Sequence, residues 1–347
     1  MRKNLLVLLT LVALLVLAAC SNTGEAVNTS APAESGGKES TTEEKEDITI
    51  AYFSAGASNN YLQTGIQEAE KVADDYGWNI EVYDGGFDPL TQLNQVQNAV
   101  AQDKYDAFLI EAVDGNQLCD IVQSQVLPKG IAVSAINIEL CGAIDEAAEG
   151  TLTFVGGQGV NIYEDIYKNI VENNPEGGKI AVIGGPSTGT PYLNNIKGME
   201  KVIASDDKWE IIGPFSTDYT ANQAFQVAQN AIQANPDLKV IFSNYSGMTN
   251  GVVEAVNAAG KKGEIKIYDF GGDEWSFNAI KNGDIEQTVI MLPKEEVQRG
   301  MEAIQLHFEG KDVPTFYDLT TEDILPGTPY VNKNNIGEFE TKGLPEY

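Results

Sequence analysis

The chain has 347 residues, which suits two lobes of about 150 residues each better than a single core. Hydrophobic residues make up 42%, enough to build such cores, and acidic residues outnumber basic ones 51 to 22. The resulting formal charge of −29 repels a phosphate backbone, which argues against nucleic-acid binding. One histidine and three cysteines cannot supply a histidine-rich metal site, so we expect no metal.

The beginning of the chain has the pattern of a secretory signal. A basic start, Met1-Arg2-Lys3, precedes an apolar run from Leu5 to Leu17 that is too short to span a membrane. The following Leu17-Ala18-Ala19-Cys20 resembles the bacterial lipobox, in which the cysteine is diacylated and becomes the new N-terminus. We therefore expect a lipoprotein signal peptide over residues 1–19 and lipid attachment at Cys20. A plain signal peptide or an anchor helix is the alternative.

After Cys20 the composition changes to small, polar and acidic residues as far as residue 47. Such a segment buries too little apolar surface to offset the entropy lost on ordering it, so residues 20–47 are predicted to form a disordered tether. We therefore expect the protein to lie outside the cytoplasm, anchored to the cell membrane by its N-terminal lipid.

Two further cysteines, Cys119 and Cys141, lie 22 residues apart in the sequence. An oxidising compartment favours a disulfide between them, which would stabilise the fold by about 3 kcal/mol. Two buried free thiols are the alternative.

From residue 48 onward, predicted strands and amphipathic helices alternate. The run Ile48–Phe53 is a predicted strand, and Tyr61–Tyr76 carries apolar residues at helical spacing. Further strands are predicted near 79–83, 107–110, 131–136, 151–155, 179–183, 210–215, 239–243, 265–270 and 286–290. Further helices are predicted near 90–100, 119–126, 161–173, 190–204, 220–234, 248–259, 274–282 and 294–309. This alternation predicts an α/β fold with two doubly wound parallel-sheet lobes, because about ten strands in one open sheet would be unusual.

Several short motifs occur in a specific order along this region. They are Asn60-Tyr61, Asn235–Phe242, Asp269–Asp273, Gly283–Val289 and Val331–Ile336. Together with the lipobox, their order and spacing resemble the ribose/galactose class of periplasmic binding proteins, which are the solute-binding subunits of sugar ABC transporters. The similarity covers about residues 48–340.

The resemblance implies two lobes joined by a three-crossing hinge, the periplasmic binding protein-like I fold. The N-terminal lobe would comprise 48–157 and 292–319, and the C-terminal lobe 158–291 and 320–336, followed by a tail at 337–347. The resemblance also implies that the hinge closes around the ligand and that a permease recognises the closed form.

Candidate ligand-binding residues follow the predicted strands, at the edge where ligands collect in such sheets. Amide, hydroxyl and aromatic side chains suit the hydroxyls and C–H faces of a sugar. The candidates are Asn60, Tyr61, Asn137, Tyr192, Asn195, Tyr219, Tyr245, Asp273 and Trp275. Tyr61 could instead be a core residue, and Asn60 or Asp273 only a helix N-cap. Ile138, or Glu139 with a one-residue shift, stands where the family carries an arginine, and Met291 stands where it carries a glutamine.

Without the family's charged contacts, the predicted pocket suits a small neutral solute. The resemblance thus implies an extracytoplasmic lipoprotein that captures a monosaccharide and delivers it to the permease subunits of an ABC transporter. A sensory binding lipoprotein, or a binding protein for a non-sugar solute such as a nucleoside, is the alternative. We expect a monomer that needs no cofactor. We expect no enzyme, because no nucleophile–base pair is apparent and His307 lies among apolar residues of a predicted helix.

Overall fold

The computed structural model describes residues 48–347. The predicted signal peptide, the lipid attachment at Cys20 and the predicted tether lie outside these residues. None of the helices in the described part has the length and hydrophobicity that a membrane crossing requires.

The first of two sheets has six strands in the order β11-β5-β4-β3-β1-β2, and all neighbours are parallel. Its strands are β1 (Thr49–Ser54), β2 (Asn79–Asp84), β3 (Ala107–Glu111), β4 (Ala132–Asn137), β5 (Thr153–Gly156) and β11 (Phe316–Tyr317). β1, β3 and β4 are buried on both faces, which explains why they consist almost wholly of apolar residues.

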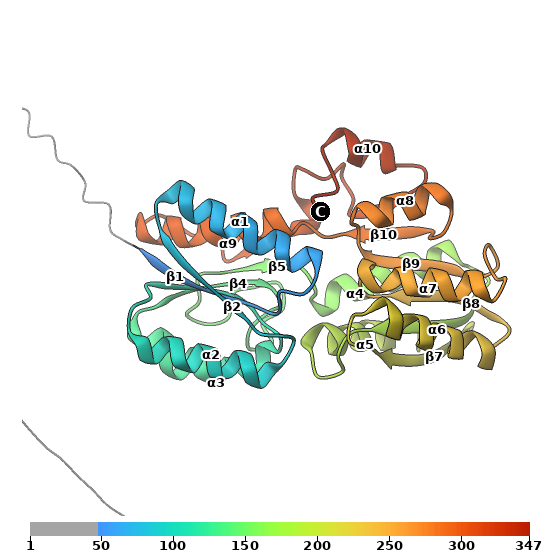
Figure 1. Cartoon of the computed structure of the whole chain (residues 1–347), viewed down its shortest axis with the longest axis horizontal. Coiled ribbons are helices and arrows are strands. Elements are labelled where there is room, and N and C mark those ends of the chain that lie inside the picture. Colours follow the sequence, from blue (N-terminus) through green and yellow to red (C-terminus); the bar gives the residue numbers. More distant parts are fainter. Residues whose placement is uncertain (1–47) are drawn as a thin grey trace, which may run out of the picture. The chain divides into compact units, whose positions relative to one another are not determined.

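Helices cover both faces of this sheet and complete the first lobe (Figure 1). α1 (Asn60–Tyr76) and α9 (Pro293–Phe308) pack together on one face, and α2 (Pro89–Gln102) and α3 (Gly115–Ile121) lie on the other. The predicted helix at 119–126 starts too late. α3 begins earlier because the Asp114 side chain accepts hydrogen bonds from two backbone N–H groups of its first turn, and a π-helical turn (Val122–Val126) and a 3₁₀ turn (Leu127–Lys129) follow it.

The second lobe is built around another six-stranded sheet, in the order β12-β10-β9-β8-β6-β7. Its strands are β6 (Gly178–Gly184), β7 (Trp209–Ser216), β8 (Leu238–Ser243), β9 (Lys266–Gly271), β10 (Gln287–Ile290) and β12 (Tyr330–Asn332), of which only β12 is antiparallel to its neighbour. α4 (Val160–Asn173) and α5 (Thr190–Val202) cover one face. The other face carries α6 (Ala221–Ala234), α7 (Ser246–Ala258), α8 (Glu274–Asn282) and α10 (Ile336–Thr341).

Two sheets of this kind confirm the predicted fold class. The chain passes from one sheet to the other after β5, after β10 and between β11 and β12. The lobe boundaries given above stay a prediction, but the strand pairing explains why the late strands β11 and β12 belong to different lobes.

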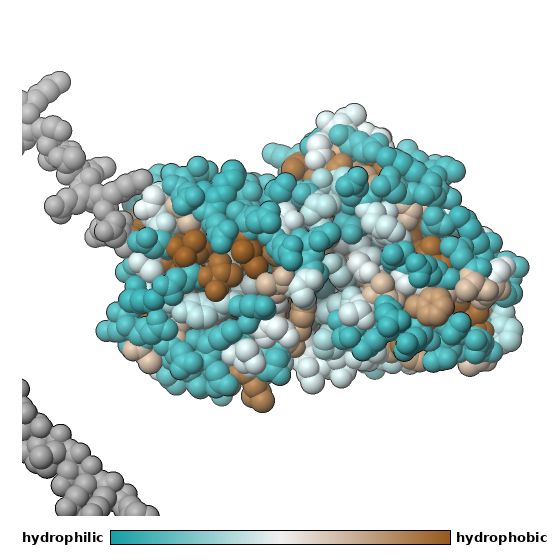
Figure 2. All heavy atoms as spheres, viewed as in Figure 1, coloured by the Kyte–Doolittle hydropathy of each residue, from teal (hydrophilic) through white to brown (hydrophobic). Residues whose placement is uncertain are grey.

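The structure also contains the predicted disulfide. It joins Cys119 in α3 to Cys141 in the loop after β4, with the two Cα atoms 4.8 Å apart. The visible face of the molecule is largely hydrophilic with a few small apolar patches, one of which lies below α1 (Figure 2).

Candidate functional site

A cavity lies at the carboxyl ends of strands from both sheets. The residues that line it follow β1, β2, β3, β4 and β5 in the first lobe, and β6, β7, β8 and β10 in the second. It encloses about 620 Å³ of space free of protein atoms, part of it open to solvent. Its place at the strand ends is typical of a small-molecule site in α/β proteins.

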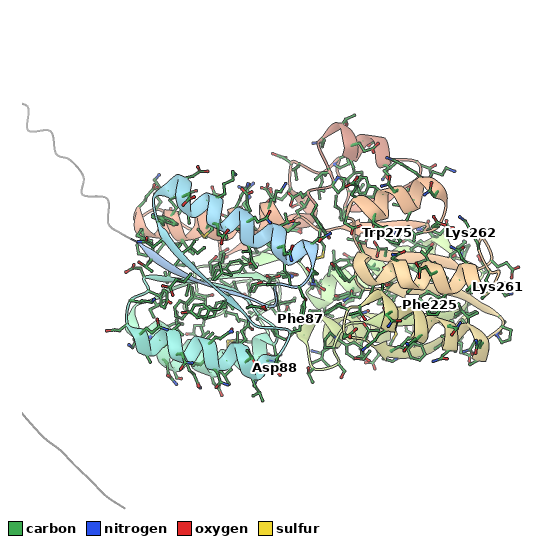
Figure 3. The ribbon with its side chains drawn as sticks, in the orientation of Figure 1. Phe87, Asp88, Phe225, Lys261, Lys262 and Trp275 are labelled. Carbon is green, nitrogen blue, oxygen red and sulfur yellow. A yellow bond between two sulfur atoms is a disulfide. The ribbon has the colours of Figure 1, made fainter. Side chains whose placement is uncertain are left out.

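Aromatic side chains from both lobes form much of the cavity wall. Phe87 of the first lobe lies where that lobe faces the second, and its ring centroid is 5.3 Å from that of Tyr219 (Figure 3). Tyr219 in turn meets Tyr245 edge to face at 5.8 Å, and Tyr61 lines the cavity from α1. Flat apolar faces of this kind bind C–H surfaces of a ring-shaped ligand.

The position of Tyr219 depends on a glycine behind it. A Cβ atom at Gly185 would lie 2.0 Å from Cζ of the Tyr219 ring, so no other residue leaves room for the ring there. Tyr219 also has a φ of 63°, a left-handed conformation that is costly for a residue with a side chain. The fold therefore holds the Tyr219 ring at the cavity wall at the cost of a strained backbone at this residue.

A chain of hydrogen bonds links the lobes along the cavity. The Tyr163 hydroxyl of α4 donates to Oε1 of Gln158 at 2.8 Å, and Gln158 Nε2 donates to Oδ1 of Asn137 at 3.2 Å. Asn137 Nδ2 then donates to Oε1 of Glu111 at 3.0 Å. Asn137 has a φ of 62°, which turns the chain sharply at the end of β4. Its side chain therefore connects the two lobes.

Two buried carboxyl groups belong to this region. Glu111 lines the cavity, and Glu296 of α9 accepts a hydrogen bond from the Tyr61 hydroxyl. Burial is the main reason why the pKa of both carboxyl groups is raised. Neighbouring side chains change the two pKa values to a smaller extent. Of the described residues, no lysine or arginine lines the cavity. The site therefore offers no counter-charge to an anionic ligand.

Asn244 also lines the cavity, and its amide lies beside the buried Tyr163 hydroxyl. Its side chain is only 2% exposed, and neither its amide nitrogen nor its amide oxygen makes a hydrogen bond among the described residues. A buried polar group in this state costs free energy unless a bound molecule pairs with it. The sequence analysis missed this residue and chose its neighbour Tyr245, although Asn244 directly follows β8 and the strand-end rule applies to it equally.

Away from the cavity centre, the lobes touch through polar contacts. The Thr190 N–H donates to the Val113 carbonyl at 3.1 Å, and Asn194 Nδ2 donates to Oε1 of Glu139 at 2.9 Å. Glu139 is buried, burial raises its pKa, and its second oxygen has no partner among residues 48–347. These contacts pair groups that would meet water if the lobes separated.

Four of the nine predicted ligand-binding residues line this cavity, namely Tyr61, Asn137, Tyr219 and Tyr245. Five lie elsewhere. Asn60 is exposed at the start of α1, where its neighbour Asn59 is the actual N-cap. Tyr192 packs against Gly184, and Asn195 accepts a hydrogen bond from the Tyr167 hydroxyl.

The other two residues lie at the start of α8. Asp273 caps this helix by accepting a hydrogen bond from the Ser276 N–H at 2.8 Å, and Trp275 packs against the second-lobe core (Figure 3). Their contact with a ligand, like that of the other predicted residues, stays a prediction. No group of three or more His, Cys, Asp or Glu side chains that could hold a metal ion occurs in the described part.

Comparison with known proteins shows to which family the chain belongs. Residues 50–312 match the model of a family described as periplasmic binding protein domain. The chain belongs to this family. Periplasmic binding proteins are solute-binding proteins and not enzymes.

Relatives of this periplasmic binding protein have names that state their ligands. The ribose import binding protein RbsB of Bacillus subtilis is 25% identical over 314 residues, which is 90% of this chain and 95% of the relative. The xylitol-binding protein of Mycolicibacterium smegmatis is also 25% identical, over 79% of this chain and 76% of the relative. A solved solute-binding protein from Agrobacterium vitis with bound D-fucose has a TM-score of 0.74 at 23% identity, covering 85% of this chain and 99% of that one.

Proposed function

We propose that this protein captures a small neutral carbohydrate in the cavity between its lobes and delivers it to an ABC permease. The observation that carries the proposal is an interlobe cavity at the strand ends whose wall carries aromatic rings from both lobes, Phe87 from the first and Tyr219 and Tyr245 from the second. The names of the relatives, which include ribose, xylitol and fructose binding, support a sugar or polyol as the ligand.

The charges around the cavity support a neutral ligand. Glu111 lines the cavity without a neighbouring cation, and its raised pKa reflects the cost of holding a charge there. The negative charge of a sugar phosphate or sugar acid would find no lysine or arginine among the described residues of the cavity wall. A neutral ring with hydroxyl groups needs only hydrogen bonds and aromatic faces, which Asn244 and the tyrosines supply.

We propose that binding closes the lobes about the crossings after β5 and β10. The contacts of Thr190 with Val113 and of Asn194 with Glu139 stabilise the closed form, because each pairs one residue from each lobe. A ligand that bridges the lobes adds to them and shifts the population toward closure. The closed pair of lobes then presents the surface that the permease recognises.

A lipid at Cys20 is proposed to anchor the protein outside the cytoplasmic membrane. The basic start, the short apolar run and the small residues before Cys20 support this. Cys20→Ala is expected to release the protein into the soluble fraction of the cell, as shown by fractionation and immunoblotting. Retention of the variant in the membrane fraction would contradict lipid attachment at this residue.

A thermal-shift screen of neutral sugars, polyols and nucleosides tests the ligand class. A ligand present at 100 times its dissociation constant stabilises the fold by about 2.7 kcal/mol, which gives a clear rise in melting temperature. Asn244→Ala is expected to abolish the shift, whereas Asn257→Ala, on the exposed face of α7, keeps it. If only nucleosides shift the melting temperature, the carbohydrate proposal is wrong.

A further inference from the structure

Residues 344–347, which we call the tail strap, reach from the second lobe to the first. Leu344 is buried in the core of the second lobe, and its N–H donates to the Phe339 carbonyl of α10 at 3.1 Å. From there the chain runs to Tyr347, which lies between the two lobes (Figure 1). The tail strap therefore begins in one lobe and extends to the boundary with the other.

Glu346 attaches the tail strap to the first lobe. Its Oε2 atom accepts a hydrogen bond from the Lys294 N–H at 2.6 Å. Lys294 lies in the first turn of α9, and Leu292, the residue before this helix, supplies no side-chain cap. The N–H groups of a helix N-terminus need acceptors, so the Glu346 side chain takes the place of the missing cap. Since α9 starts directly after the crossing that follows β10, this contact lies beside the hinge.

Tyr347 contacts both lobes at once. In the second lobe, its carbonyl accepts a hydrogen bond from the Glu274 N–H at 2.9 Å, and its hydroxyl donates to the Gly271 carbonyl at 2.8 Å. In the first lobe, its ring meets that of Tyr61 in α1 edge to face, with the centroids 5.8 Å apart. Tyr61 also lines the ligand cavity, so the tail strap reaches a residue of the cavity wall.

These contacts add a fourth link between the lobes, beside the three chain crossings. Unlike the crossings, this link is not covalent and can break. A rotation that moves α1 and α9 away from β9 and α8 separates the partners of the tail strap, because Glu346 and Tyr347 hold groups on both sides. Opening of the lobes therefore loses hydrogen bonds and aromatic contact at the hinge as well as at the cavity.

We propose that the tail strap stabilises the closed form of the two lobes, so that the ligand-free protein opens less readily than its three crossings alone would allow. The inference goes beyond the proposed function, because it concerns the protein without a ligand.

Hydrogen–deuterium exchange of the intact, ligand-free protein tests the inference. The Thr190 N–H donates to the Val113 carbonyl across the lobes, so its exchange reports their separation, whereas the amides of β8 lie inside the second lobe. Tyr347→Ala is expected to speed exchange of the peptide that contains Thr190 about tenfold and to leave the β8 peptide unchanged. Unchanged exchange at Thr190 overturns the inference. An equal increase in the β8 peptide also overturns it, because the tail strap would then support the core of the second lobe.

Two conservative variants give a matched comparison. Tyr347→Phe removes only the hydroxyl of the tail strap, and the Gly271 carbonyl keeps its hydrogen bond from the Met291 N–H, so exchange at Thr190 is expected to rise about two- to fivefold. Tyr268→Phe removes a hydroxyl that accepts from Nδ2 of Asn174 within the second lobe, and it is expected to leave exchange at Thr190 unchanged. If both variants speed this exchange alike, the inference is wrong. Since no ligand is added, neither result bears on the proposed function.

Discussion

Closure of the lobes can be tested at one hydrogen bond that joins them. Asn194 in α5 of the second lobe donates from Nδ2 to Oε1 of Glu139, which follows β4 of the first lobe, at 2.9 Å. The same amide nitrogen donates to the Gln158 carbonyl at 3.0 Å. Asn194→Ala removes both bonds and leaves the Glu139 carboxyl group buried without a partner in the closed form.

The size of the effect follows from the environment of Glu139. Its second oxygen has no partner among the described residues, so the variant would leave the whole carboxyl group unpaired. A hydrogen bond to a charged group contributes about 1.5–3 kcal/mol, and in the open form water replaces it. We therefore expect the substitution to reduce the stability of the closed form and not that of the open form. The ligand should then bind about 10- to 150-fold more weakly.

Calorimetry with the best-binding sugar from the screen measures this loss. Asn222→Ala is the matched control, because Asn222 is exposed on α6 of the same lobe. Glu139→Gln keeps an oxygen acceptor for Asn194 and is expected to weaken binding less. Small-angle X-ray scattering should show a larger radius of gyration for ligand-free Asn194→Ala than for the native protein.

Two results would refute this reasoning. If Asn194→Ala binds the sugar as tightly as the native protein, the contact does not stabilise closure. If the variant binds weakly but also melts as far below the native protein as a core variant such as Phe242→Ala, Asn194 supports the second lobe itself.

Three further predictions concern stability and the cavity wall. Replacing Cys119 and Cys141 together by serine should lower the free energy of unfolding by about 3 kcal/mol in urea titrations, and an unchanged midpoint would contradict this. Burial raises the pKa of Glu346 from 4.5 to about 7, so the folded state holds this proton more tightly than the unfolded chain does, and stability falls as pH rises across that window. Glu346→Gln should make the fall in melting temperature between pH 4.5 and 7 shallower, and an equally steep fall would show that other groups cause it. Gly185→Ala should displace the Tyr219 ring and weaken sugar binding about tenfold or more in calorimetry, unless the ring is not part of the site.

The sequence by itself determined the strand–helix alternation of both lobes. Apolar runs such as 107–110 and helical spacing such as that of 61–76 reflect local contacts, so they can be recognised without knowledge of the fold. The same holds for the pairing of Cys119 with Cys141, since the chain offers few cysteines and the predicted compartment favours oxidation. The short strands β11 and β12 could not be found this way, because two or three residues have no periodicity and are defined only by the strand beside them.

The tertiary structure alone decided which residues line the cavity. The strand-end rule led to Asn137, Tyr219 and Tyr245, which line the cavity, but it could not choose between the neighbours Asn244 and Tyr245. Consecutive residues at a strand end point in different directions, and the packing around them decides which side chain reaches the cavity. Trp275 also follows a strand, but its side chain packs against the core of its own lobe and not at the cavity. No local feature of the sequence distinguishes such a residue from one that lines the cavity.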